Sequence, residues 1–156
     1  IFPNTGSIGT DARVVHKGTS TARKQLQFDS SVSGSIAMVV DRSTISGTRT
    51  SVANTIVPGA WHYVCGTYDE TNGPRVFLNG AEVAYSTNQP GSGATVLDNG
   101  DLFFIGNRGD GQRTFNGTID EVRLYNRVLT LSEIQQLYAL TAITKPPPPM
   151  TLKVGP

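Results

Sequence analysis

The acidic pair Asp120-Glu121 stands in a run, residues 118–125, that alternates apolar and polar side chains. Paired carboxylates are the reagents of glycoside hydrolysis, which needs two acid groups about 5 to 9.5 Å apart across one bond. On a β-strand, successive side chains point to opposite faces, so these two carboxylates are predicted to point away from each other. The alternation therefore predicts two structural roles and not a catalytic pair.

The two acids are predicted to have different partners. Glu121 shares a face with Arg123, and the two can form an exposed ion pair worth about 0.5 kcal/mol. Asp120 shares the other face with Val122 and Leu124, so its carboxylate is expected to point toward the core and to need a partner there. Backbone N–H groups would satisfy it. A calcium ion would do so too, but calcium takes about 6 to 8 oxygen ligands, and Asp120 is the only candidate visible in this run.

Other residues that carry out catalysis are scarce. Cys65 is the only cysteine, which excludes an internal disulfide and a cysteine metal cluster. A catalytic thiolate would need a histidine base, and His62 lies three residues away in the same strand-like run, a spacing that puts the two side chains on opposite faces. None of the four Glu residues has an acidic neighbour two positions away, and no nucleophile elbow, phosphate-binding Gly loop or paired-histidine motif occurs. We therefore expect a protein that is not an enzyme.

Residues 107–113, NRGDGQR, are the candidate binding loop. Its residues Asn107, Arg108 and Asp110 present planar donors and acceptors that suit a sugar or a protein partner. The Arg-Gly-Asp tripeptide within it is too short to indicate receptor adhesion, and a solvated turn explains it as well. Tyr85 and Tyr125 are the rings that could stack on a pyranose, with ordinary packing as the alternative. Of the two rings, Tyr85 joins the loop as a predicted ligand contact.

The charge balance excludes two classes of partner. The chain has 13 Lys and Arg residues against 12 Asp and Glu, spread without runs, so it lacks the basic surface that nucleic acid or an anionic membrane requires. No apolar stretch approaches the roughly 20 residues that span a bilayer. We expect neither a nucleic-acid partner nor a membrane span.

Short runs of β-branched and aromatic residues, separated by clusters of Gly, Asn, Asp and Ser, predict an all-β domain. Asn79-Gly80 predicts a two-residue hairpin turn, because both residues tolerate the positive φ angles of a type I′ turn. Nine short strands in one domain need two packed sheets or a barrel. The predicted strands are residues 12–16, 24–29, 34–40, 50–56, 61–68, 75–78, 81–86, 102–105 and 118–125.

One helix and one linker complete the organisation. Thr130 and Glu133 form a capping box, and Leu129 and Ile134 form a hydrophobic staple, so a helix is predicted to start here and to run to about Leu140. Residues 145–149, KPPPP, predict a stiff polyproline spacer. We therefore expect a domain over residues 1–142 and a linker with the start of a further segment over 143–156. Because the chain lacks an initiating Met and a leader, we expect it to come from a longer, modular protein.

Several of these motifs, in this order, resemble the laminin G-like, concanavalin A-like jelly-roll domains. They are VVHKG (14–18), WHYV (61–64), TYD (67–69), VFLNG (76–80), IG (105–106) and FNGTIDEVRLYNR (115–127), followed by the capped helix. The resemblance implies an antiparallel two-sheet sandwich, with further family strands before residue 1. It also implies a non-catalytic module of secreted or cell-surface proteins, with a polysaccharide, a glycan or an extracellular protein as partner. In the family a structural calcium site joins an early segment to the aspartate that corresponds to Asp120.

Overall fold

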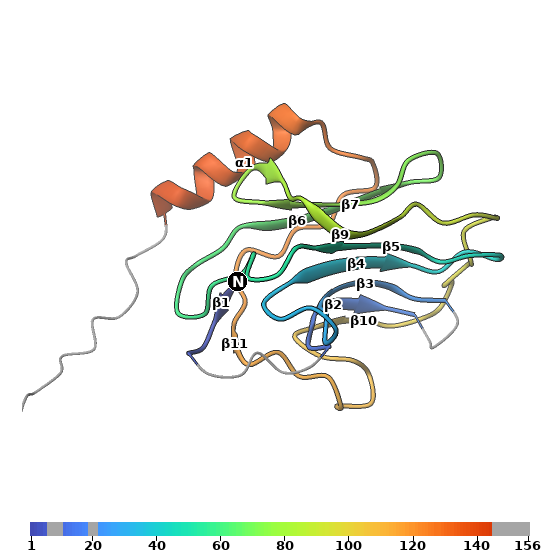
Figure 1. The fold of residues 1–156 in the computed structure, drawn as a ribbon, viewed down its shortest axis with the longest axis horizontal. Helices are drawn as coiled ribbons and strands as arrows, with labels where there is room; N and C mark the ends of the chain where they lie inside the picture. Colours follow the sequence, from blue (N-terminus) through green and yellow to red (C-terminus); the bar gives the residue numbers. More distant parts are fainter. Residues whose placement is uncertain (6–10, 19–21, 145–156) are drawn as a thin grey trace, which may run out of the picture.

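The structure, a computed structural model, describes residues 1–5, 11–18 and 22–144 (Figure 1). Most of the predicted linker lies outside these residues, so the boundary predicted near residue 142 stays a prediction. The described part is built from antiparallel strands and one helix. Its elements are β1 (Phe2–Pro3), β2 (Arg13–Lys17), β3 (Lys24–Phe28), β4 (Ile36–Val40), β5 (Gly47–Ser51), β6 (Val64–Asp69), β7 (Gly73–Leu78), β8 (Ala81–Glu82), β9 (Tyr85–Gln89), β10 (Phe103–Ile105), β11 (Gly117–Thr118) and α1 (Leu131–Thr144).

The strands form two main sheets, and a two-stranded pair, β1-β11, lies beside them. The larger sheet has six strands in the order β10-β2-β3-β4-β5-β9, and the smaller has three in the order β6-β7-β8. β7 packs against β4 and β5 of the larger sheet. The predicted all-β sandwich of antiparallel sheets is confirmed.

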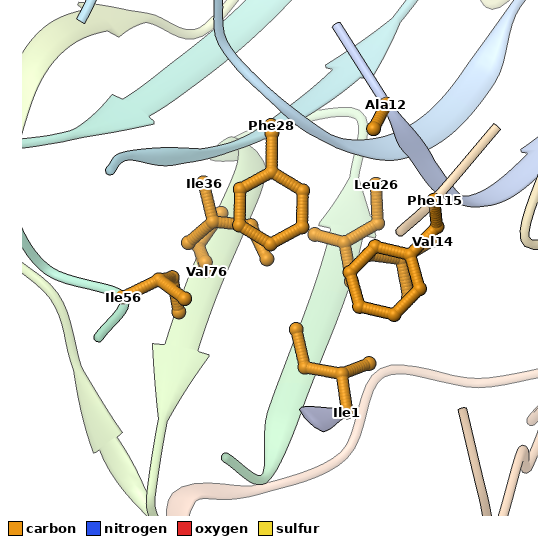
Figure 2. Close-up of a cluster of buried hydrophobic side chains, with 9 residues drawn as sticks. All are labelled: Ile1, Ala12, Val14, Leu26, Phe28, Ile36, Ile56, Val76 and Phe115. Carbon is orange, nitrogen blue, oxygen red and sulfur yellow. The ribbon is translucent and has the colours of Figure 1, made fainter. Parts of the chain in front are cut away.

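The main core lies between the six-stranded sheet and β7 (Figure 2). On the larger sheet, Leu26 and Phe28 of β3 and Ile36 of β4 point to the same side, because alternate residues of a strand share a face. Val76 of β7 is fully buried in the same cluster, whereas its neighbour Phe77 faces the opposite way and packs against α1. The small sheet therefore lies between the large sheet and the helix.

The Asn79-Gly80 hairpin is confirmed. Both residues have positive φ, 50° and 81°, and they join β7 to β8 through the pair Leu78 and Ala81. This is the geometry that a type I′ turn demands, and it tolerates few residues other than Asn and Gly.

The start of the helix is also as predicted. Thr130 N donates to Glu133 Oε2 (2.8 Å), and Glu133 N donates to Thr130 Oγ1 (3.3 Å), which closes the capping box. Leu129 and Ile134 are buried together against Phe77. The helix runs four residues beyond the predicted end, to Thr144. Within the described part of the chain, no helix is long and apolar enough to cross a membrane.

The largest departure from the predicted strands follows β11. Residues 118–125 were expected to form one strand, but the ladder ends at Thr118, and residues 119–129 belong to no strand or bridge. Glu121 has a φ of 53°, in the left-handed region, which breaks the alternation on which the expectation depended. The segment is thus extended chain without a ladder partner among the described residues.

Candidate functional site

The acidic pair lies on the surface of the unpaired segment. Asp120 and Glu121 are both exposed, and Glu121 Oε2 accepts a hydrogen bond from Arg123 Nη2 at 2.8 Å, which confirms the predicted ion pair. The expectation that Asp120 points into the core is wrong. Alternation directs a side chain inward only where a ladder fixes the strand's orientation, and here Leu124 is 69% exposed.

The Asp120 carboxylate is bonded to the backbone of the next residue. Its Oδ1 accepts a hydrogen bond from Glu121 N at 2.8 Å, and no group of three His, Cys, Asp or Glu side chains able to hold a metal occurs among the described residues. Calcium needs about 6 to 8 oxygen ligands. Calcium binding through Asp120 stays a prediction, and the further ligands would have to come from groups beyond this set.

The candidate binding loop, residues 107–113, is held by its own side chains. Asn107 Oδ1 accepts hydrogen bonds from the backbone N–H groups of Arg108 (2.7 Å) and Arg113 (3.2 Å), and Asn107 Nδ2 donates to Thr114 Oγ1 (3.0 Å). Arg108 pairs with Asp110 through two of its nitrogen atoms. The hydrogen bonds from Arg108, and then the backbone N–H of residue 112, lower the pKa of Asp110 to about 2. The hydrogen bonds of Asn107 therefore fix the conformation of the loop, and Arg108 and Asp110 are its charged groups.

Tyr85 lies far from this loop. It begins β9 at one edge of the six-stranded sheet, whereas residues 107–113 follow β10 at the other edge. Five strand spacings separate the two edges, or about 24 Å. Tyr85 and the loop residues therefore cannot contact the same sugar ring.

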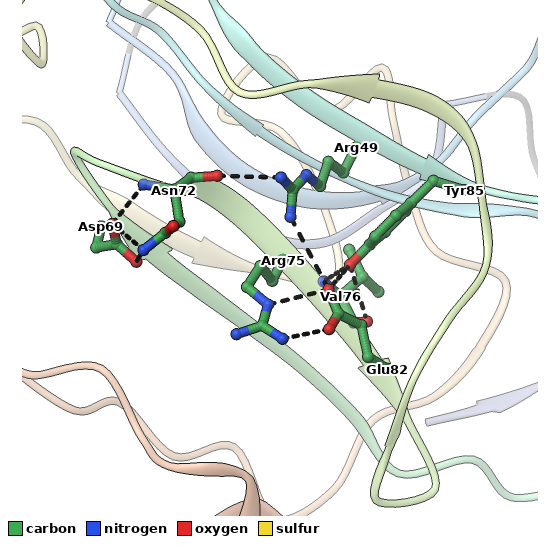
Figure 3. Close-up of polar contacts among 7 residues, drawn as sticks. All are labelled: Arg49, Asp69, Asn72, Arg75, Val76, Glu82 and Tyr85. Atoms are coloured by element: carbon green, nitrogen blue, oxygen red, sulfur yellow. Dashed lines mark hydrogen bonds and ion pairs between the residues drawn. The ribbon is translucent and has the colours of Figure 1, made fainter.

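The ring and hydroxyl of Tyr85 already have partners (Figure 3). Its Oη accepts a hydrogen bond from Val76 N (3.0 Å) and donates to Glu82 Oε1 (2.7 Å). The Arg49 guanidinium lies 5.2 Å from the ring centroid, and Arg75 forms a two-point ion pair with Glu82. A stacking role for Tyr85 stays a prediction, because Arg49 covers one face of the half-buried ring.

The loop lies instead beside a polar set on the face of the six-stranded sheet opposite the core, here called the outer face. Cross-strand registers place Arg13 opposite Gln27, and His16 opposite Gln25, with all four on the outer face. We call these four side chains the quartet. One rung of this face crosses all six strands as Phe104, His16, Gln25, Val39, Thr48 and Gln89.

The quartet is buried, yet several of its polar atoms lack a hydrogen-bond partner. Arg13, His16, Gln25 and Gln27 are each at most 8% exposed. Gln25 Nε2 donates to Gln27 Oε1 at 2.6 Å, but Gln25 Oε1, Arg13 Nε and both His16 ring nitrogens have no partner in the described structure. A buried polar group without a partner costs about 1 to 3 kcal/mol, so these atoms are expected to meet water or a ligand.

Contacts of the loop with Phe104 join it to the quartet. A Cβ placed on Gly109 would lie 2.8 Å from Phe104 Cζ, so the loop backbone rests on this ring. The Phe104 ring centroid is 6.3 Å from that of His16. Burial, and then the charges of Arg13 and Arg108, lower the pKa of His16, so the imidazole is neutral near pH 7, with one donor and one acceptor. Loop, ring and quartet together form the outer-face site.

The reasoning from sequence missed the quartet. The alternation of Gln25 and Gln27 around Leu26 is visible in the sequence, but an alternating strand normally turns its polar side chains to water. Only the register with β2 shows that these amides are buried beside His16 and Arg13.

A hollow lies on the inner side of the six-stranded sheet, opposite the outer face. This inner cavity has a volume of about 1100 Å³ and is bounded by that sheet, by β6 and by residues 119–129. Val15, Leu26 and Met38 line its floor, and aromatic rings such as Trp61 and Tyr125 line its walls. It is largely apolar.

Cys65 also lines the inner cavity and is not activated as a nucleophile. Burial raises the pKa of its thiol to about 11, which keeps the sulfur protonated at neutral pH. His62, the nearer histidine in sequence, is bonded instead to the backbone of Val57 through Nε2 (2.9 Å to Val57 O). Cys65 is therefore a partly buried, protonated thiol.

Comparison with known proteins gives one family and one solved structure to report. The Laminin_G_3 model, described as the concanavalin A-like lectin/glucanases superfamily, matches residues 3–135. The chain is similar to residues 221–444 of an S-layer domain-containing protein from Clostridium thermocellum ATCC 27405, known from a crystal structure, at 21% identity and a TM-score of 0.42. That match covers 88% of this chain and 69% of the other. No curated protein matches.

Proposed function

Because the chain belongs to the Laminin_G_3 family of the concanavalin A-like lectin/glucanases superfamily, we propose that it is a non-catalytic carbohydrate-recognition module. The observation that carries this proposal is the outer-face site. The unpartnered atoms of Arg13, His16 and Gln25 comprise both donors and acceptors, and a sugar hydroxyl can both donate and accept. A polyol therefore satisfies such a set better than a purely donating or purely accepting group.

The setting of the site supports the same assignment. Sugar sites combine a few directed polar groups with an apolar ring, and Phe104 lies beside the imidazole of His16. The adjacent loop adds Asn107, Arg108 and Asp110, the residues predicted from sequence to contact a ligand. We place the module outside the cell or on its surface, the usual setting of the domains that it resembles.

The carboxylates support a non-catalytic role. Each of the four Glu side chains has a structural partner, and three of these partners are arginines. A glycosidase needs one carboxylic acid held protonated near neutral pH. The pKa of Glu133, by contrast, is lowered to about 2, first by its hydrogen bonds with Arg127 and then by those of Thr130. The pairs are Glu70 with Thr95, Glu82 with Arg75, Glu121 with Arg123 and Glu133 with Arg127.

Glycan arrays and pull-down on insoluble polysaccharides test the proposal, with Gln25→Leu as the diagnostic variant. Loss of hydrogen bonds at Gln25 is expected to weaken sugar binding by about 1 to 3 kcal/mol, roughly 5- to 150-fold. Gln89→Leu is the matched control, because Gln89 lies on the same rung and face but is exposed at the far edge. Failure of the folded wild-type chain to bind any glycan would contradict the proposal.

A second candidate function, adhesion to a protein without sugar binding, is favoured by a different observation. Residues 119–129 carry exposed apolar side chains, including Val122 (39%), Leu124 (69%) and Val128 (44%), beside the inner cavity. An exposed apolar surface of this kind suits contact with another protein. If adhesion is the function, Leu124→Ser will weaken binding to a purified extracellular partner and Gln25→Leu will not.

Calcium belongs to the proposal only as a ligand to be tested. No cluster of three His, Cys, Asp or Glu side chains occurs among the described residues, so we expect calcium to bind with a dissociation constant of about 1 mM or weaker. Calorimetric titration of the wild type and of Asp120→Asn measures this. Micromolar binding that is lost in Asp120→Asn would show a complete site at this aspartate.

A further inference from the structure

Arg13 differs from the other arginines around the outer-face site. Arg23 pairs with Asp41 (2.9 Å), Arg113 pairs with Asp11 (3.2 Å), and Arg108 pairs with Asp110 in the binding loop. No carboxylate of the described residues lies at ion-pair distance from Arg13. Its Nη1 donates a hydrogen bond to the backbone oxygen of Asp11, and its Nε has no hydrogen-bond partner in the described structure.

Arg13 is also the most deeply buried of these arginines. It is 5% exposed, whereas the side chains of Arg23, Arg108 and Arg113 are 33% to 37% exposed. Removal of a charged group from water without a counter-ion is unfavourable. Consistent with this, burial is the main cause that lowers the pKa of Arg13 to about 10. The Asp11 carboxylate opposes this shift of the pKa, but it also pairs with Arg113, so Arg13 and Arg113 together carry one positive charge more than this carboxylate neutralises.

The geometry of the quartet defines what could neutralise this charge. Directly opposed side chains on neighbouring strands have Cβ atoms about 4.5 to 5.5 Å apart, so the quartet spans roughly the width of one pyranose ring. An arginine guanidinium is planar and presents parallel N–H donors, so Arg13 can bind two anionic oxygens at once. His16 and Gln25 lie one rung away and offer donors and acceptors suited to hydroxyl groups.

We propose that the quartet binds an acidic sugar, whose anionic group pairs with Arg13 while its hydroxyls bond to His16 and Gln25. This inference rests on the proposed carbohydrate recognition and names the ligand class. The anionic group is either a carboxylate, as in a uronic acid, or a sulfate ester. The quartet selects it because a neutral sugar would leave Arg13 and Arg113 to share the single negative charge of Asp11.

The decisive probe is a polymer whose charge can be removed without a change of backbone. Binding of polygalacturonate and alginate is compared by affinity electrophoresis with binding of their methyl esters and of cellulose, and dextran sulfate is compared with dextran. At least one anionic polymer is expected to bind ten times more tightly than its neutral counterpart. If carboxylated polymers meet this criterion, the anion is a carboxylate; if only dextran sulfate does, it is a sulfate ester.

Substitutions test whether Arg13 causes the preference for anionic over neutral polymers. Arg13→Gln is expected to abolish the preference for the anionic polymer, and Arg13→Lys, which keeps the charge but loses the parallel donors, to reduce it. Arg49→Gln is the control, because Arg49 is a half-buried arginine of β5 on the other face of the sheet, and it should leave the preference unchanged. If Arg13→Gln does not fold, the wild-type comparison and Arg13→Lys decide.

The results separate failure of this inference from failure of the proposed function. Equal binding of charged and neutral polymers, or a preference that survives in Arg13→Gln, overturns the acidic ligand and leaves sugar recognition intact. Absence of binding to every polymer and to glycan arrays overturns both.

Discussion

The outer-face site and the inner cavity lie on opposite sides of the same three strands. On β2, β3 and β4 the inner side chains Val15, Leu26 and Met38 form the floor of the cavity. His16 follows Val15 on β2, and Gln25 precedes Leu26 on β3. These two neighbours point to the outer face and belong to the quartet. A register shift between Arg13 and Val15 brings Arg13 to the same face as His16. The strand pairing thus builds both an apolar hollow and a buried polar site, and a slip of one residue would destroy both.

The two regions also differ in what they leave unsatisfied. The outer-face site lacks hydrogen-bond partners for buried polar atoms, and the inner cavity exposes apolar side chains of residues 119–129 to water. A polar ligand would satisfy the first deficiency, and apolar contact would satisfy the second. Under the proposed function we therefore expect substitutions on the outer face to change sugar binding, and substitutions on the inner side to change stability or contact with another protein.

The largest expected effect is loss of the core on the inner side. Phe28→Ala removes a ring that is 3% exposed and stacked 5.7 Å from Phe115, and should cost about 3 to 5 kcal/mol of unfolding free energy. Gln27→Leu, one residue away on the outer face, should cost less, about 1 to 3 kcal/mol, because it leaves the buried Gln25 Nε2 without its acceptor but opens no cavity. Urea denaturation followed by circular dichroism measures both. Equal costs would contradict the assignment of the two faces.

The next effect concerns the contact between the candidate binding loop and Phe104. Gly109→Ala places a methyl group against Phe104, and we expect a cost of about 1 kcal/mol, at the low end for overpacking, because an exposed loop can shift. Binding to the sugar ligand should weaken as the loop moves. Phe104→Leu in the same chain gives the methyl group room and should restore stability, which thermal unfolding will show. A lack of restoration would mean that the loop does not rest on this ring.

The next smaller effect is a pH dependence of stability that arises from His16 on the outer face. The pKa of folded His16 lies below its usual value of about 6.5, chiefly because of burial, with Arg13, Arg108 and Arg23 adding to the shift and Asp110 opposing it. As the pH falls from 7 toward the folded pKa, the unfolded chain takes up the proton first, so stability should fall. His16→Gln should lose this dependence between pH 7 and 5, as measured by the thermal midpoint. An unchanged pH profile would contradict a buried, neutral His16.

The smallest expected effect tests the inner side of the comparison. Leu124→Ser should alter stability by less than about 0.5 kcal/mol, because Leu124 is mostly exposed, but it should reduce the fluorescence of a bound hydrophobic dye. Leu129→Ser, five residues later and 7% exposed, is the control and should cost about 2 to 5 kcal/mol. A large cost at Leu124 would mean that residues 119–129 are packed in solution.

The parts of the fold that depend on neighbours in sequence were predictable. The Asn79-Gly80 turn, the capping box of Thr130 and Glu133, and the ion pair of Glu121 with Arg123 each join residues within three positions of one another, and all are present. Residue type and spacing are sufficient there, because a few backbone angles bring such residues together.

The candidate site was predictable only in part. The composition of residues 107–113 indicated a binding loop, but its placement beside His16 depends on β10 pairing with β2, almost ninety residues earlier. The predicted strand over residues 118–125 failed for a related reason: alternation marks a segment that can pair, and a partner must still lie beside it.

The sequence by itself determined the alternation of each strand, the hairpin turn, the helix start and the scarcity of catalytic groups. Only the tertiary structure decided that Tyr85 and the binding loop lie at opposite sheet edges, and that Arg13, His16, Gln25 and Gln27 meet in a buried set. The physical reason is that alternation assigns a residue to a face of its own strand. The pairing of strands distant in sequence then decides which side chains share that face and whether water reaches them.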